Sequence, residues 1–308
     1  MNYQIRPHTI PTPYLVGPIH IYEVTIGDET ILFDTGPPTS EGLQYLLEHI
    51  DIEKLSAVLV THFHPDHYGL LSEIEKRSDA TLIVPKKDLT LLENSDQRSQ
   101  FICAYMDEIG FPDKIIRELQ SVIPSFHTSV PKAKKYQLLE RSGKILDKYG
   151  IMTISCPGHS QTDNVYIFGG NAVTGDILLK NIFQAPILDL DVDIAHSRFQ
   201  NYYHYCRSIY KLKQLETFKI LPSHNEKIES VSQQISFYAN KIIERSSRLL
   251  SMFENGDNVF QVLNKLFPEM SNNAFKLYIK ASEVIFLKDY LERPNLLQQA
   301  LADNEIQI

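Results

Sequence analysis

Cysteine is scarce in this sequence, and its placement does not suggest disulfide bonds. The 308 residues include three cysteines, Cys103, Cys156 and Cys206, which lie far apart along the chain. An odd number of distant cysteines is not the pattern of a disulfide framework. No apolar run approaches the ~18 residues of a membrane span, and the N-terminus lacks the apolar core of a signal peptide. We therefore expect a cytoplasmic protein that has no membrane partner.

Long basic stretches are also absent. Lysine and arginine number 30 against 38 aspartates and glutamates, so the formal net charge is −8. Because nucleic acids are bound largely through Lys and Arg contacts to phosphate, this balance argues against a nucleic-acid partner. The hydrophobic fraction of 43% is ordinary for a globular protein. The chain can therefore bury a substantial core.

The N-terminal part alternates two kinds of hydrophobic pattern. Residues with strand patterning are 19–26, 30–34, 57–60 and 81–84, and those with helical spacing are 42–50 and 69–76. Strands that alternate with helices are typical of α/β proteins, so this is the predicted fold class.

Two later segments are dominated by helical periodicity. The pattern over residues 86–130, with approximate bounds, predicts a helical insert. This insert either closes over a ligand as a lid or packs its own core. Strands are predicted again at residues 137–139, 144–146, 151–155, 165–168, 171–174 and 219–221. Beyond them the pattern is almost entirely helical. We therefore predict a catalytic domain over 1–228 and a helical C-terminal region over 229–308.

Histidine is concentrated in the run His62-Phe63-His64-Pro65-Asp66-His67, which directly follows a predicted buried strand. Imidazole and carboxylate groups together suit a divalent ion such as Zn²⁺. The alternative is a helix N-terminus that is capped by Asp66 and carries exposed histidines. Three further candidates each follow a strand and a small residue, and singly each is more typical of a turn: His159, Asp176 and His224.

Five short motifs resemble, in order, those of the metallo-β-lactamase superfamily: Asp34-Thr35-Gly36, the run 62–67, His159, Asp176 and His224. The resemblance covers roughly residues 15–226 and implies a four-layer αββα sandwich. It implies that a first metal ion is bound by His62, His64 and His159. It implies that a second is bound by Asp66, His67 and His224, and that Asp176 bridges the two. Asp34 matches the superfamily's non-ligand aspartate, which we expect to orient a ligand histidine.

With Asp66 and His224 as members, the second ligand set resembles that of the dinuclear glyoxalase II type. The implied activity is hydrolysis by a hydroxide shared between two divalent ions, because metal binding lowers the pKa of water into the neutral range. Asp66 is expected to align this hydroxide, so Asp66 and Asp34 are the catalytic candidates. Zinc is the expected metal, with iron and manganese as alternatives, since imidazole–carboxylate sites accept several ions.

The expected substrate is a small molecule with an acyl or ester group, and thioester or carboxylic-ester hydrolysis is the leading interpretation. A phosphodiesterase or ribonuclease and a lactonase are alternatives, although Leu179 stands where acyl-homoserine-lactone hydrolases typically carry a tyrosine. A metal-containing regulatory protein that acts through its helical tail is the non-enzymatic alternative. Whether the chain forms a homodimer stays open. Four aromatic residues are candidates for substrate contact, although each could instead belong to the core: Phe101, Tyr105, Phe183 and Tyr202.

Overall fold

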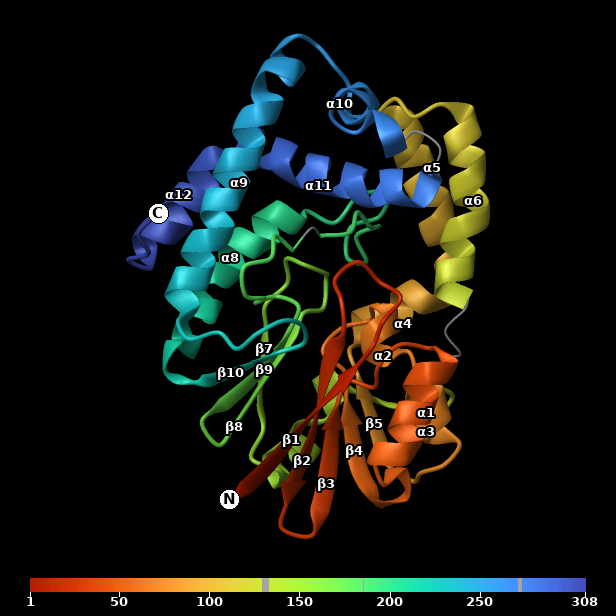
Figure 1. Ribbon diagram of the computed structural model, residues 1–308, viewed down its shortest axis with the longest axis vertical. Helices are drawn as coiled ribbons and strands as arrows, with labels where there is room; N and C mark the ends of the chain where they lie inside the picture. The colour runs from red at the N-terminus through yellow and green to blue at the C-terminus, as the bar shows by residue number, and fades with distance from the viewer. Residues whose placement is uncertain (129–132, 185, 271–272) are drawn as a thin grey trace.

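The computed structural model describes residues 1–128, 133–184, 186–270 and 273–308, and its strands form two sheets (Figure 1). The six-stranded sheet has the order β1 (Tyr3–Ile10), β2 (Ile19–Ile26), β3 (Glu29–Phe33), β4 (Leu55–Leu59), β5 (Thr81–Val84) and β6 (Gln137–Leu138). The four-stranded sheet has the order β10 (Lys219–Pro222), β9 (Asn171–Gly175), β8 (Asn164–Phe168) and β7 (Met152–Ser155).

Parallel pairing in both sheets brings the candidate site residues to strand ends that lie close together. Strands β3, β4 and β5 are parallel neighbours, so Asp34 and His62 follow two strands that end at the same edge. Strands β9 and β10 are also parallel, and Asp176 and His224 follow their ends. The two edges are joined by a hydrogen bond from the backbone nitrogen of His20 to the carbonyl of Ser223, 2.6 Å long.

Helices cover the outer face of each sheet (Figure 1). Helices α1 (Ser40–His49) and α3 (Leu71–Glu75) lie beside the six-stranded sheet, and α8 (Asn201–Lys213) and α9 (Val231–Glu254) beside the four-stranded sheet. Side chains alternate between the two faces of a strand. On β4, Val58 packs toward α1 and α3, whereas Leu59 packs between the sheets. On β8, Tyr166 packs between the sheets and Ile167 toward α8 and α9. The layers are therefore helix, sheet, sheet and helix.

The predicted insert consists of three helices with short connections in its described part, and the C-terminal region is mostly helical. The insert contains α4 (Lys86–Glu93), α5 (Ser95–Glu108) and α6 (Asp113–Thr128), and its last two residues lie outside the described ranges. The tail continues after α9 with α10 (Val259–Leu266), α11 (Ala274–Glu292) and α12 (Pro294–Asp303). Helix α11 crosses from α9 toward α5 and α6 (Figure 1), and Leu277 shares one buried cluster with Ile102 and Leu119 of the insert. Insert and tail therefore pack into a common core.

Two elements differ from the prediction. Residues 144–146 were predicted to be a strand but belong to helix α7 (Gly143–Lys148), because a short apolar run fits a buried helix as well as a strand. Strand β1 was not predicted, and only His8 and Ile10 of it are buried, so its sequence carries little alternation. The remaining short elements are α2 (Pro65–Tyr68) and 3₁₀ turns at Ile52–Lys54, Leu139–Arg141, Gln214–Thr217 and Pro268–Met270. Within the described ranges, no helix is both long and apolar enough to cross a membrane.

The packing between the sheets gives a stability prediction. Leu59 is fully buried between them, so Leu59→Ala should lower the free energy of unfolding by about 2–5 kcal/mol, through lost burial and a residual cavity. Leu47 on α1 is 49% exposed, and Leu47→Ala is the matched control, with an expected change below about 0.5 kcal/mol. Urea unfolding followed by circular dichroism measures both, and similar effects of the two changes would contradict the layer assignment.

Candidate metal centre

The candidate ligands come from loops at the junction of the two sheets. The chain leaves β4 extended, with His62 and His64 two residues apart, and Pro65 then begins α2, which carries Asp66 and His67. Pro65 suits a first helical position, because its missing N–H would have no partner there. The four-stranded sheet supplies the other three candidates, His159 after β7, Asp176 after β9 and His224 after β10. The structure thus brings together all seven predicted ligands.

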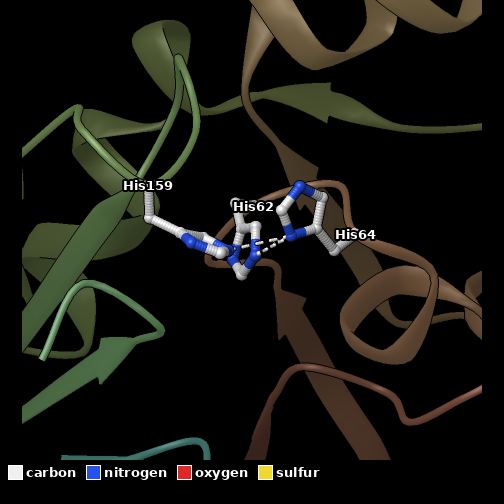
Figure 2. Close-up of side chains that lie close together, drawn as sticks. All are labelled: His62, His64 and His159. Carbon is white, nitrogen blue, oxygen red and sulfur yellow. Dashed lines mark hydrogen bonds between the residues drawn. The ribbon is translucent and has the colours of Figure 1, made fainter. Parts of the chain in front are cut away.

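His62, His64 and His159 form the first set, and Figure 2 shows their rings pointing toward one another. The Nδ1 atom of His64 is 3.0 Å from Nε2 of His62 and 3.0 Å from Nε2 of His159. Burial, together with the neighbouring His159, lowers the pKa of His64 to about 3. Burial likewise places the pKa of His62 well below its ordinary value. These two rings are therefore neutral at pH 7, the form in which imidazole binds a metal.

Asp66, His67 and His224 form the second set, in which hydrogen bonds fix the proton on each ring. The Nδ1 atom of His67 donates to Oδ2 of Asp34 over 2.8 Å, and that of His224 donates to the carbonyl of Pro18 over 2.8 Å. On each ring the Nε2 atom is therefore the nitrogen that faces the centre, and it would bind a cation after losing its proton. Within the described part of the chain, neither Nε2 atom has a hydrogen-bond partner.

The carboxylate of Asp176 lies between the two sets. Its Oδ1 atom is 3.4 Å from Nε2 of His67 and 3.5 Å from Nε2 of His224, and its Oδ2 atom is 3.7 Å from Nε2 of His159. Two ligand atoms about 2.1 Å from one ion at a tetrahedral angle lie about 3.4 Å apart. The spacing around Asp176 therefore suits cations on both of its sides.

Whether a cation fits between the two sets depends on the hydrogen bonds of the buried ligand atoms and on the charges around them. Oδ1 of Asp176, like the Nε2 atoms of His67 and His224, has no hydrogen-bond partner among the residues described. Such buried polar atoms are unfavourable unless a ligand satisfies them. Burial lowers the pKa of His67, but the carboxylates of Asp176 and Asp34 outweigh it and raise that pKa well above its ordinary value. Unsatisfied nitrogen and oxygen donors at a negative potential fit divalent metal ions.

Asp34 organises the loop that carries the histidines. It has a backbone φ of 60°, in the left-handed region that aspartate tolerates better than most residues. Its carboxylate accepts hydrogen bonds from Nδ1 of His67 and from both the backbone nitrogen and the hydroxyl of Thr61, at 2.8–2.9 Å. The contact with His67 is the one expected for Asp34. Sequence reasoning missed Thr61, although its position directly before His62 was a usable signal.

Other residues that position His159 were also missed. The Asp163 carboxylate accepts hydrogen bonds from the Ser160 backbone nitrogen at 2.8 Å and from the Ser160 hydroxyl at 2.7 Å, which closes the turn after His159. The side-chain amide of Asn201 donates to the carbonyl of Gly158 over 3.1 Å. The three-residue spacing of Ser160 and Asp163 suggests such a turn, whereas nothing local points to Asn201.

A small cavity of about 30 Å³ lies beside His64 and His159. The lining includes apolar side chains from three parts of the chain, Phe63, Leu91, Ile187 and Phe199. Polar residues complete it, among them the buried Asp88 and Asp189 and the partly buried Arg98. Helices α4 and α5 of the insert therefore supply part of a wall directly next to the candidate metal centre.

The four aromatic candidates for substrate contact do not line this cavity. Tyr202 is fully buried, and its hydroxyl donates to the carbonyl of Arg293 over 3.0 Å. Phe183 stacks on Tyr238 with ring centroids 4.8 Å apart. The candidates all pack within or against the apolar cluster of the helices, and their part in substrate binding stays a prediction: Phe101, Tyr105, Phe183 and Tyr202.

Sequence comparisons relate the chain to proteins of one family. The family model described as "Metallo-beta-lactamase superfamily" matches residues 14–224. The chain is 28% identical over 296 residues to "Probable metallo-hydrolase YqjP" from Bacillus subtilis, covering 92% of this chain and 90% of that protein. It is 22% identical over 271 residues to "Beta-lactamase-like protein 2 homolog" from Drosophila melanogaster, covering 84% of this chain and 78% of that protein.

Solved structures share the fold. The metallo-beta-lactamase family protein TTHA1429 from Thermus thermophilus superposes with a TM-score of 0.73 at 18% identity, covering 94% of each chain. A beta-lactamase domain protein from Burkholderia ambifaria gives a TM-score of 0.68 at 17% identity, covering 92% of this chain and 86% of that chain. At these identities the likeness shows the arrangement of helices and strands alone.

The contact between Asp34 and His67 gives a test of the centre. Asp34→Asn removes the charge that holds the His67 proton on Nδ1, so metal affinity should fall by about 10–100-fold. Competition with a chromophoric chelator measures this affinity. Asp28→Asn, at an exposed position of the β2–β3 hairpin, is the matched control and should bind metal like the unsubstituted protein. Unchanged affinity in a folded Asp34→Asn protein would contradict the assigned role.

Proposed function

The chain belongs to the metallo-beta-lactamase superfamily, and from this premise we propose that it is a metal-dependent hydrolase that cleaves a thioester or a carboxylic ester in a small molecule. The observation that carries the proposal is the placement of Asp176 between two sets of side chains whose free nitrogen and oxygen atoms converge. The similarity to a protein described as a probable metallo-hydrolase supports the same reaction class.

The ligand sets suggest two divalent ions in an arrangement of the glyoxalase II type. His62, His64 and His159 would hold one ion, and Asp66, His67 and His224 the other, with Asp176 shared between them. Nitrogen and carboxylate donors suit zinc, and iron or manganese are the alternatives. Elemental analysis of protein purified without added metal distinguishes them.

The chain's own residues prepare the site for hydrolysis. Bound divalent ions supply Lewis-acid chemistry, which activates water and polarises a carbonyl group. His67 and His224 offer only their Nε2 atoms, because Asp34 and the carbonyl of Pro18 hold the opposite ring protons. Asp66, whose Oδ2 atom is 3.4 Å from Nε2 of His224, would align the attacking water through its carboxylate.

The cavity beside the first histidine set favours an ester over a phosphodiester. Arg98 is the cation in its lining, and it already forms a buried ion pair with Asp189, with 2.6 Å between Nε and Oδ1. Phosphate binding would call for cationic side chains directed at the ligand. An uncharged acyl group needs no such partner and gains from the apolar wall.

The proposed function makes a direct prediction for two variants. His64→Ala and Asp176→Ala should each reduce metal-dependent hydrolysis to background, because each removes a donor that the other residues cannot replace. The measurement is a panel of acyl-thioesters, aryl esters, lactones and bis-p-nitrophenyl phosphate with metal-loaded protein. His49→Ala and Asp28→Ala are matched controls at exposed positions and should keep full activity.

Two results would overturn the proposal. Turnover retained by metal-free Asp176→Ala protein would show that the reaction does not use this centre. Efficient cleavage of bis-p-nitrophenyl phosphate with no cleavage of any ester or thioester would favour a phosphodiesterase instead.

A further inference from the structure

The small cavity beside His64 and His159 shares part of its lining, here called the wall, with a second cavity of about 260 Å³. The second cavity lies between α4, α5 and the loop that includes Val192 and His196. Leu91 and Arg98 line both cavities. These two side chains therefore separate a space of about 30 Å³ next to the candidate metal centre from a much larger one beyond it.

The two halves of this wall differ in how firmly they are held. Arg98 is largely buried and binds Asp189 through two parallel hydrogen bonds, an arrangement that fixes the plane of the guanidinium group. Leu91 lies on α4 and is 8% exposed, and its side chain has no polar atom that could fix it by a hydrogen bond. The Arg98 side chain is thus fixed in the wall by its ion pair. The Leu91 side chain can be truncated by substitution without breaking a hydrogen bond.

Apart from the candidate metal ligands, the ionisable side chains that line the small cavity are compensated by their surroundings. The charge of Arg98 is balanced by Asp189. The remaining buried acid, Asp88, accepts a hydrogen bond of 2.5 Å from the hydroxyl of Thr162, and burial raises the pKa of Asp88 to about 8. An uncharged group therefore enters this cavity without leaving a buried charge unpaired.

We infer that the small cavity is the acyl subsite, that it admits short uncharged acyl groups, and that Leu91 determines their maximum length. This inference rests on the proposed ester or thioester hydrolysis. The cavity touches His64 and His159, so a carbonyl at the centre would direct its acyl chain into this space. About 30 Å³ accommodates roughly two water-sized groups, whereas drug-sized ligands occupy about 300–1,000 Å³.

The test compares acyl chain lengths in the metal-loaded protein. We expect p-nitrophenyl acetate to be cleaved with a kcat/KM at least about 10-fold above that of the octanoate, since misfit of even one methylene group in a pocket is worth about 10-fold or more. Leu91→Ala joins the two cavities and should raise the ratio of octanoate to acetate kcat/KM by at least about 10-fold. Comparing this ratio between variants cancels the intrinsic reactivity of the esters.

Two further variants keep the result specific. Leu89→Ala is the matched control, because Leu89 lies on the same helix but packs against the cluster beneath α1 and α3. It should leave the ratio unchanged. Leu91→Val makes a smaller opening and should shift the ratio in the same direction if Leu91→Ala fails to fold. Equal cleavage of octanoate and acetate by the unsubstituted protein, or an unchanged ratio in folded Leu91 variants, overturns the inference.

A binding measurement separates this inference from the proposed function. Acetate, butyrate and octanoate are titrated calorimetrically into the metal-loaded protein as analogues of the acid product. If no ester or thioester is cleaved, the proposed function fails. The subsite assignment then stands only if Leu91→Ala strengthens octanoate binding relative to acetate, and it falls if the relative affinities are those of the unsubstituted protein.

Discussion

Buried polar atoms need partners, and this constraint dominates the junction between the two sheets. The Nε2 atoms of His67 and His224 and the Oδ1 atom of Asp176 are all buried there without a hydrogen bond from the described residues. A folded protein retains such atoms when a ligand satisfies them. The surrounding hydrogen bonds serve this arrangement, because the Asp34 carboxylate and the Pro18 carbonyl take up the opposite ring protons. The parallel strand pairs, in turn, bring these loops together at one edge.

The two ligand sets differ in their electrostatics. The first consists of three imidazoles, and burial keeps His62 and His64 neutral by lowering their pKa values. The second lies among carboxylates, which raise the pKa of His67, while His224 and His67 hold the pKa of Asp176 low against the effect of burial. A cation in the second position would replace bound protons, whereas one in the first would meet lone pairs that are already free. The centre is therefore chemically asymmetric even before a substrate arrives.

The sequence predicted the site better than its surroundings, for a physical reason. The run 62–67 follows β4 and gathers imidazole and carboxylate groups in six positions, so local pattern and side-chain chemistry were enough to select it. His159, Asp176 and His224 each looked like a turn residue singly, and the order of the motifs selected them. The cavity wall could not be found in this way. Arg98 on α5 and Asp189 are separated by 91 positions. Hydrophobic periodicity within a helix does not predict which distant loop the helix will contact. Residues 144–146 were misassigned for the opposite reason, since three apolar-rich positions carry too little periodicity to distinguish a strand from a helix.

The core that joins the insert to the tail has a consequence for how the chain tolerates cleavage. Ile102 and Leu119 of the insert are buried in the same cluster as Leu277 of α11, although more than 150 positions separate Leu119 from Leu277. A protease that removed the chain beyond α9 would uncover an apolar face on α5 and α6. Such newly exposed faces promote aggregation, and loosening of α5 would displace Arg98 from the wall of the small cavity. Truncation far from the histidines would therefore disturb the small cavity beside the candidate metal centre as well as favour aggregation.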